Sequence, residues 1–424
     1  MNILQKVTIN GFWGDRNIEI NLQPDINFLI GVNGSGKTTA INLIAAALNA
    51  DFMGLDRLPF NKIVIHLAEI GGKKRPQIEI EKRPREHSPF SKITYRVKGS
   101  ASDKAITFSL EDLEEQLLLR HYPVGYYQRQ IRKTSASIIE HLKKLINSSW
   151  LSIHRAESTP NSPEDRSYES TVDRKLDNLS NEFVKFFSFL TKQAADESNK
   201  FQKEVFLSLI PRQTEGELFL AVKKLDLDKE EKALIEIFRE FKLGKNSEEV
   251  VNEHFKTLES AVREIEKNKG LGTNALVAVV SALRTHSVVQ DWNNLVEVIR
   301  KIYEPRDTFV EIINSMMQRK ALFINEKNEL IAKTQSGKIL PLKSLSSGEK
   351  QLLIILGEAL LQERLPWVYI ADEPELSLHI SWQDKLIVNL RKINPNAQIF
   401  FATHSPDIVS CFGNRVIDME KILQ

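Results

Sequence analysis

The first third of the chain alternates apolar and polar positions over short segments separated by turns. Residues 3–9 and 18–22 alternate with a period of two, which predicts strands, and the mostly apolar residues 26–30 predict a buried strand. Further alternating segments span residues 62–67, 77–82 and 93–97. The part of the chain up to about His154 is therefore predicted to consist largely of strands.

The middle of the chain, roughly residues 160–319, changes to a helical pattern. Apolar residues recur there at spacings of three and four, which predicts helices that pack on one another. Each seam lasts only two to three heptads, which favours a helical lobe over one long coiled-coil arm. Helix breaks are expected at Pro211, Gly244, residues 269–272 and Pro305, and residues 160–163 are expected to form a linker. The two seams are Val172, Leu176, Leu179, Phe183, Phe186 and Leu190, and Val251, Phe255, Leu258, Val262 and Ile265.

From Ala321 onward the strand pattern returns. Residues 322–325 and 330–333 predict a hairpin, and a helix is expected after Ser347. A strand at 367–370, a helix at 382–392 and a strand at 398–402 follow. The predicted fold is α/β, with residues 1–159 and 321–424 forming one domain and residues 160–320 inserted as a helical lobe.

Composition narrows the function classes without naming a partner. The 58 basic and 56 acidic residues give a formal charge of +2, so any nucleic-acid surface has to be a local patch. The single cysteine, Cys411, excludes an internal disulfide framework and a zinc cluster built on thiolates. Residues 1–6 carry no signal-peptide core, and no apolar run approaches the ~20 residues of a membrane span. We therefore expect a cytoplasmic protein that does not contact a membrane.

A glycine-rich loop follows the apolar strand at residues 26–30. Residues 31–38 fit the pattern Gly-x4-Gly-Lys-Thr, and the helix-forming residues 41–48 come just after it. In such a loop the backbone N–H groups surround the β-phosphate of a nucleotide, Lys37 reaches the β- and γ-phosphates, and the Thr38 hydroxyl binds Mg²⁺. The candidate nucleotide-binding residues are Asn33, Gly34, Ser35, Gly36, Lys37, Thr38 and Thr39.

A second apolar strand ends in two adjacent acids. Asp372 and Glu373 follow residues 367–371, which places both carboxylates at the carboxyl edge of the sheet beside the glycine-rich loop. Asp372 is expected to bind Mg²⁺, and Glu373 to polarise the water that attacks the γ-phosphorus. Such a pair is weak evidence alone and strong evidence together with the loop.

Two further motifs each leave an alternative open. Residues 345–351 place serines and a glycine at a helix start, which suits either anion binding or an ordinary N-cap. His404 follows the last predicted strand, where it either senses the γ-phosphate or has a structural role.

The four motifs, in this order, resemble the RecF/OLD/SMC branch of ABC-type ATPases. The resemblance makes residues 31–38 Walker A, 345–351 the signature, 370–373 Walker B and His404 the switch histidine. It implies hydrolysis of ATP with Mg²⁺, with Glu373 and His404 as catalytic residues, in a homodimer or a higher oligomer. In that dimer the signature of one chain covers the ATP held by the other. The implied signature contacts are Ser346, Ser347, Gly348 and Glu349.

Departures from the familiar family pattern point away from a transporter. Ser347 and Glu349 replace a glycine and the glutamine of the usual signature, which this branch accepts, and residues 372–379 differ from a transporter D-loop. The candidates for the Q-loop glutamine are Gln128 and Gln130, and the alternative is that both belong to an ordinary surface stretch. Stacking of Phe12 or Trp13 on the adenine is left open.

Residues 373–383 and 403–406 resemble ATPase subunits of bacterial anti-phage systems such as PARIS (AriA) and Septu (PtuA). OLD proteins carry a TOPRIM nuclease after the ATPase, whereas this sequence ends 20 residues after His404 (424 − 404). The resemblance therefore implies a sensor or scaffold that controls a separately encoded, nuclease-like effector. The alternative is a RecF-like DNA-repair ATPase.

A basic strip at residues 73–98 bears on that choice. It is either a surface for DNA or a partner, or a pair of ordinary solvated strands. Its basic residues are Lys73, Lys74, Arg75, Lys82, Arg83, Arg85, Lys92, Arg96 and Lys98, beside Glu79, Glu81 and Glu86.

Overall fold

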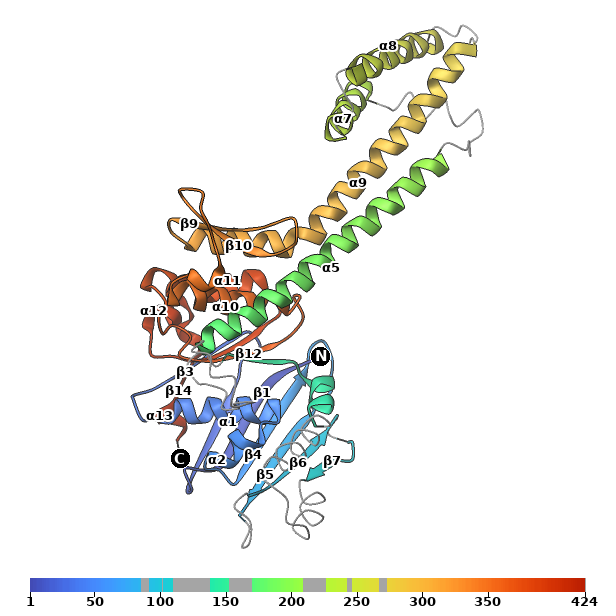
Figure 1. Cartoon of the computed structure of the whole chain (residues 1–424). Coiled ribbons are helices and arrows are strands. Elements are labelled where there is room, and N and C mark those ends of the chain that lie inside the picture. The colour runs from blue at the N-terminus through green and yellow to red at the C-terminus, as the bar shows by residue number, and fades with distance from the viewer. Residues whose placement is uncertain are drawn as a thin grey trace, which may run out of the picture. The chain divides into compact units, whose positions relative to one another are not determined.

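A computed structural model describes most of the chain, in two compact units. The described residues are 1–84, 91–100, 102–109, 138–151, 170–208, 226–241, 246–266 and 273–423. One unit joins Met1–Val184 to Arg306–Gln424, and the other is Lys185–Pro305 (Figure 1). The mixed α/β fold expected from the sequence is confirmed.

A five-stranded parallel sheet forms the centre of the first unit. Its strand order is β14-β3-β13-β12-β8, and every neighbouring pair is parallel. Parallel strands place their carboxyl ends at the same edge of a sheet, so the loops after β3, β12 and β13 meet there. The strands are β3 (Ile26–Ile30), β8 (Ser148–Leu151), β12 (Val368–Asp372), β13 (Gln398–Ala402) and β14 (Val416–Asp418).

A six-stranded antiparallel sheet forms a second layer, with the order β2-β1-β4-β5-β6-β7. Its strands alternate buried apolar residues with residues that are partly or fully exposed, which is the pattern of a sheet with one face on the core. All of the N-terminal strands predicted from the sequence are confirmed, with ends that differ by at most three residues. The strands are β1 (Asn2–Phe12), β2 (Arg16–Asn21), β4 (Lys62–Glu69), β5 (Gln77–Arg83), β6 (Lys92–Lys98) and β7 (Ile106–Ser109).

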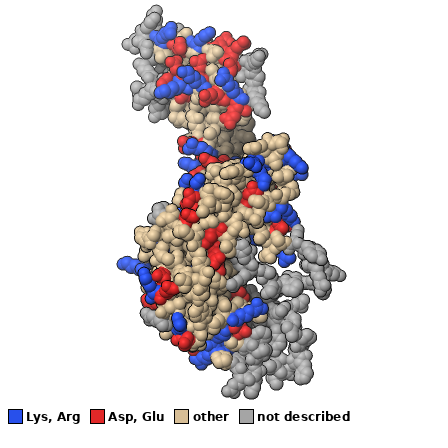
Figure 2. All heavy atoms as spheres, turned by 90° about the vertical axis from the view of Figure 1, so that its left-hand side faces the viewer, with Lys and Arg blue, Asp and Glu red and all other residues tan. Residues whose placement is uncertain are grey.

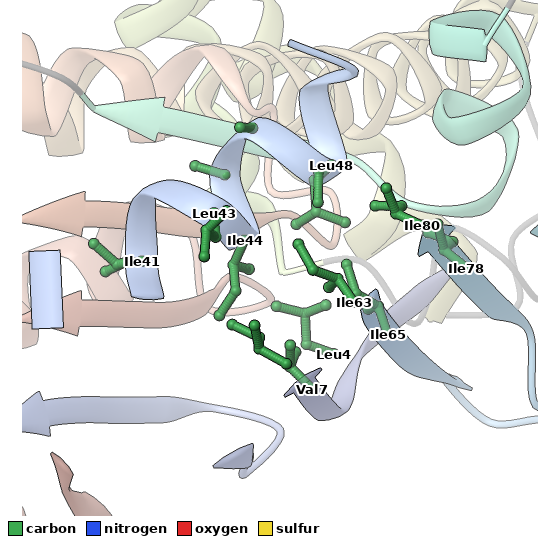
Figure 3. Close-up of a cluster of buried hydrophobic side chains, with 14 of the residues drawn as sticks. Leu4, Val7, Ile41, Leu43, Ile44, Leu48, Ile63, Ile65, Ile78 and Ile80 are labelled. Carbon is green, nitrogen blue, oxygen red and sulfur yellow. The ribbon is translucent and has the colours of Figure 1, made fainter. Parts of the chain in front are cut away.

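Helix α1 (Lys37–Asn49) packs on both sheets and carries the core. Figure 3 shows side chains of α1 directed toward those of the antiparallel sheet. The same cluster includes Val368 and Phe400 from the parallel sheet. Each buried Leu or Ile contributes roughly 1.5–3 kcal/mol to folding, so this helix is held firmly where the glycine-rich loop ends. The short helix α2 (Phe52–Arg57) follows α1. The side chains labelled in the figure are Leu4, Val7, Ile41, Leu43, Ile44, Leu48, Ile63, Ile65, Ile78 and Ile80.

A buried glutamine joins the two sheets. Gln398, at the start of β13, is completely buried and accepts a hydrogen bond from Leu4 N–H at 2.8 Å. Its amide nitrogen donates to the carbonyl oxygens of Leu4 at 2.8 Å and Gln23 at 2.7 Å. The Gln398 side chain therefore supplies hydrogen-bond partners for the backbone of Leu4 in β1. The register of the pairing between β1 and β4 shifts directly after this residue.

The C-terminal third completes the first unit. The predicted hairpin is confirmed as β9 (Lys320–Ile324) and β10 (Leu330–Thr334), which pair antiparallel. The two predicted helices are confirmed as α10 (Ser347–Leu361) and α11 (Ile380–Ile393). The remaining elements are β11 (Ile339–Leu340), the 3-10 helices η1 (Leu342–Ser344) and η2 (Ser410–Arg415), α12 (Pro406–Val409) and α13 (Met419–Ile422).

Helices make up the described part of the second unit. Helix α8 (Asn246–Glu266) buries Val251, Phe255 and Leu258 against apolar residues of α7 (Leu227–Glu240). Two longer helices, α5 (Thr171–Ser208) of 38 residues and α9 (Thr273–Met316) of 44 residues, belong partly to each unit. The first predicted seam, residues 172–190, lies in α5, which extends 18 residues beyond it (208 − 190), and the second lies in α8. No helix among the described residues is long and apolar enough to cross a membrane.

The predicted break at Pro305 is wrong, because α9 continues through this residue. A proline inside a helix removes one hydrogen bond and crowds the preceding turn, at a cost of ~3 kcal/mol or more. Phe309 and Ile313, one and two turns later, are completely buried. Their packing offsets the loss.

Candidate active site

The glycine-rich loop turns sharply between β3 and α1. Gly31, Gly34 and Gly36 have φ values of 152°, 83° and 93°, and residues that carry a Cβ atom rarely adopt such values. A Cβ on Gly36 would lie 2.8 Å from the rings of Phe12 and Trp13. The loop conformation therefore depends on these glycines.

Lys37 is buried at the centre of the loop. It is 4% exposed, and its Nζ donates to the carbonyl oxygens of Gly31 at 3.0 Å and Val32 at 3.1 Å. Burial lowers the pKa of this ammonium group, and the nearby carboxylates of Glu373 and Asp372 oppose that shift.

The first acid after β12 reaches the loop. Thr38 Oγ1 donates a hydrogen bond to Asp372 Oδ1 at 3.2 Å. The two residues are far apart in sequence but close in space, because β13 alone separates β3 from β12 in the sheet. A hydroxyl and a carboxylate at this distance are the protein ligands that Mg²⁺ takes beside nucleotide phosphates.

The second acid adopts a strained backbone conformation. Glu373 has φ 48°, in the left-handed region, and its N–H donates to Ala402 O at 2.8 Å. Its Oε1 lies 3.8 Å from His404 Nε2, and both side chains are partly exposed. Such strain in a residue other than glycine is concentrated at functional sites. The structure thus brings Lys37, Thr38, Asp372, Glu373 and His404 to one edge of the parallel sheet.

The signature segment forms a reciprocal cap at the start of α10. Ser346 is the N-cap residue, and its Oγ accepts from Glu349 N–H at 3.4 Å. In return, Glu349 Oε2 accepts from Ser346 N–H at 2.8 Å and from Lys320 Nζ at 2.7 Å. Burial alone would raise the pKa of Glu349. The hydrogen bonds from Lys320 and Ser346 outweigh burial, so the pKa is lowered. Ser346 is therefore the N-cap of α10, which was one of the two alternatives predicted from the sequence. Ser346 and Ser347 are also exposed.

The signature helix contacts the loop that follows Walker B. Gln351 Nε2 donates to Pro374 O at 2.8 Å, and a Cβ on Gly348 would lie 2.5 Å from Ser377 O. Among the described residues, the signature side chains bond within their own segment, to Lys320, to Pro374 and, through Lys350, to Asp173 of α5. None of these bonds reaches the glycine-rich loop of the same chain.

The remaining sequence candidates divide into three groups. Asn33 and Gly34 are exposed at the tip of the loop, and Thr39 lies in the first turn of α1. Phe12 is completely buried, whereas Trp13 is 41% exposed and stacks on Phe12 with ring centroids 4.9 Å apart. Both Q-loop candidates, Gln128 and Gln130, lie outside the described residues.

One buried acid was missed by the sequence reasoning. Glu375 accepts hydrogen bonds from Thr403, His404 and Ser405, the segment that carries the switch histidine. A Glu two residues after Walker B carries no signal of its own in the sequence. Its partners are identified only by the fold.

The loop fits a phosphate group. Ser35 Oγ is buried and has no hydrogen-bond partner among the described residues, although it lies inside the turn of the loop. Buried polar atoms are normally paired, so an unpaired hydroxyl in a loop of this kind suits an anionic ligand. Thr38 and Asp372 would hold a Mg²⁺ ion bound to that ligand.

The parallel sheet, the loop and the paired acids define a phosphate-loop ATPase. A family profile described as AAA ATPase domain (AAA_15) matches residues 1–409, nearly the whole chain. The chain belongs to this family and is an ATP-hydrolysing enzyme.

Solved structures of similar proteins include three Smc head domains. The head with an extended coiled coil bound to the C-terminal domain of ScpA, from Pyrococcus furiosus, is 14% identical with a TM-score of 0.44, covering 99% of this chain and 93% of that one. The head with a coiled coil and joint from Pyrococcus yayanosii is 14% identical with a TM-score of 0.42, covering 99% and 95%. The head from Thermotoga maritima is 12% identical with a TM-score of 0.37, covering 96% and 90%.

Proposed function

We propose that this ATPase hydrolyses Mg²⁺-ATP at the edge of the parallel sheet, with its residues in defined roles. Lys37 and the backbone of residues 33–39 hold the phosphates, and Thr38 and Asp372 hold the metal ion. The observation that supports this most directly is the convergence of Thr38, Asp372, Glu373 and His404 from three neighbouring strands.

Each residue acts through its position. Mg²⁺, when bound, would neutralise part of the phosphate charge. Lys37 would exchange its bonds to Gly31 and Val32 for bonds to phosphate oxygens. Glu373, fixed by its N–H bond to Ala402, would orient the attacking water and accept its proton. His404, whose Nε2 lies 3.8 Å from Glu373 Oε1, would donate to the γ-phosphate.

A complete site is proposed to form in a homodimer. Among the described residues, the signature residues make no hydrogen bond to the glycine-rich loop of their own chain, and Ser346 and Ser347 are exposed. In the shared arrangement, Ser346 and the N–H of Gly348 would contact ATP held by the other chain. Glu349, being bonded to Ser346, would act by holding that serine in place.

At the level of the cell, we propose that the protein is the sensor or scaffold ATPase of a bacterial anti-phage system. The support is the resemblance of residues 373–383 and 403–406 to such ATPase subunits. The effector would be a separate, nuclease-like protein that this chain controls through its ATP cycle.

The basic strip gives less support to a DNA-binding role. Glu79 bonds to Lys62 at 3.0 Å and to Arg96 at 2.6 Å, and Glu81 bonds to Arg83. Lys82 Nζ donates to three carbonyl oxygens at and after the end of α2. The same mixture of signs is found on the whole face of the molecule that Figure 2 shows, where basic and acidic side chains are interspersed over the described residues. DNA binding by the RecF-like alternative would need a surface with less internal pairing.

Co-expression in bacteria tests the cellular proposal. The chain together with its genomic neighbour should lower phage plating, whereas the chain alone, or the pair carrying Lys37→Ala, should not. Full protection from the chain alone would contradict a separate effector. Protection by the Lys37→Ala pair equal to wild type would contradict control by ATP.

A further inference from the structure

The loop after Walker B contains a carboxylate that has no role in the proposal above. Glu375 is only 8% exposed. Its Oε1 accepts three hydrogen bonds, from Thr403 Oγ1 at 2.5 Å, His404 N–H at 3.0 Å and Ser405 N–H at 3.2 Å. Hydrogen bonds to a charged acceptor are about twice as strong as neutral ones. One oxygen atom therefore fixes three consecutive residues of the switch segment.

The second oxygen of the same carboxylate is unpaired. Glu375 Oε2 is buried and has no hydrogen-bond partner among the described residues. Leaving a buried carboxylate oxygen unpaired is unfavourable, and a side chain serving stability alone would satisfy both oxygens. This arrangement favours a role in positioning over a role in packing.

The switch segment is held from other directions as well. Thr403 N–H donates to Leu29 O at 3.2 Å, next to the start of the glycine-rich loop. Ser405 Oγ donates to Gln383 Oε1 at 2.7 Å. These contacts fix the two ends of the segment, whereas Glu375 holds the backbone of His404 itself.

The loop that carries Glu375 also rests on the signature helix. Gln351 bonds to Pro374 O, and Gly348 lies against Ser377 O, so α10 contacts this loop on both sides of Glu375 in sequence. Glu375 connects these contacts directly to the backbone of His404 in the switch segment.

We infer that Glu375 is a positioning residue of the ATPase: it holds the His404 backbone so that the imidazole stands 3.8 Å from Glu373, and it links that geometry to the signature helix. The inference rests on the proposed roles of Glu373 and His404. Catalysis is sensitive to displacements of about 1 Å, which can reduce rates ~100-fold.

Three variants test the inference by steady-state ATPase kinetics. Glu375→Met keeps the length of the side chain and removes both acceptors, so kcat should fall on the order of 30–100-fold while the KM for ATP changes less than ~3-fold. Glu375→Gln keeps one acceptor and should stay within ~5-fold of the wild-type kcat. Glu326→Ala, at an exposed turn, is the matched control and should behave as wild type.

Combination with His404→Ala separates positioning from independent effects. If Glu375 acts through His404, Glu375→Met should slow the His404→Ala enzyme by less than ~3-fold. Full multiplication of the two effects, a wild-type kcat for Glu375→Met, or a Glu375→Gln variant as slow as Glu375→Met would overturn the inference.

The same variants also distinguish a wrong role for Glu375 from a wrong role for His404 in the proposed function. A wild-type rate for His404→Ala alone would remove the proposed role of His404, and the inference with it. A slow His404→Ala beside a fast Glu375→Met would remove the inference only. If Glu375→Met does not fold, Thr403→Val removes one donor to Glu375. Its kcat should fall with little change in KM, and that effect should vanish in the His404→Ala enzyme; an unchanged kcat would overturn the inference.

Discussion

At the scale of single residues, the site combines a buried cation with a strained acid. Lys37 is held by two backbone carbonyls, and Glu373 keeps a left-handed backbone because its N–H is bonded to Ala402. Both arrangements are unfavourable in isolation and are maintained by the sheet edge around them. Such residues are expected to contribute to the reaction more than to stability.

Glu373→Gln should separate binding from hydrolysis. The amide keeps the shape of the side chain but cannot accept the proton of the attacking water, so kcat should fall on the order of 100-fold or more. Nucleotide affinity, measured by equilibrium binding of a fluorescent ATP analogue, should stay within ~3-fold of wild type. Wild-type turnover in this variant would show that Glu373 is not the general base.

Lys37→Ala should weaken nucleotide binding itself, and hydrolysis with it. Without the ammonium group, the loop offers only backbone dipoles to the β- and γ-phosphates, and the affinity for ATP should fall at least ~10-fold. The same binding assay measures the loss. Unchanged affinity would contradict the contact between Lys37 and the phosphates.

At the scale of elements, one serine at the start of α10 has both a structural role and a proposed functional role. Ser346 caps the helix and bonds to Glu349, which Lys320 also holds. Reciprocal caps fix the first turn of a helix, so the exposed hydroxyl is held in one orientation before any partner chain arrives.

Ser346→Ala should lower the free energy of unfolding by ~1 kcal/mol, because it removes the N-cap acceptor of α10. The adjacent Ser347→Ala is the matched control, because Ser347 is exposed and lies inside the helix, and it should change stability by less than ~0.5 kcal/mol. Urea denaturation followed by circular dichroism measures both. Equal losses in the two variants would contradict the capping role.

Elements with strong local signals were predictable from the sequence, and those defined by distant partners were not. The glycine-rich loop and β13 follow from spacing and apolar runs alone. The four residues of β8, by contrast, form a strand because they pair with β12 more than 200 residues later. The predicted helix break at Pro305 was wrong for a similar reason. The buried residues that offset the cost of the proline pack through tertiary contacts, which the local sequence does not show. Glu375 was missed because its three donors lie 28 to 30 residues away.

At the scale of the whole molecule, the chain carries one glycine-rich loop and one signature. A symmetric dimer that pairs each signature with the loop of the other chain would produce two equivalent sites from one interface. The alternative is that each chain hydrolyses ATP by itself, and that the signature is only the capped start of α10.

A mixing experiment decides between these arrangements. Lys37→Ala and Ser346→Arg should each abolish activity alone. In a mixed dimer, one site receives Lys37 from the second chain and Ser346 from the first, so about a quarter of wild-type ATPase activity should return at equal ratios, by random assortment. No recovery, with mixed dimers confirmed by native mass spectrometry, would contradict the shared site.

The indole beside the glycine-rich loop makes the protein its own optical reporter. Trp13 is partly exposed, stacks on Phe12, and lies where a Cβ on Gly36 would touch it. A nucleotide that fills the loop changes the polarity and the water around this ring, so its emission should shift when ATP binds. The chain contains five tryptophans, and Trp13→Phe would identify the part of the signal that belongs to the loop. Occupancy can then be followed in unlabelled protein, in real time.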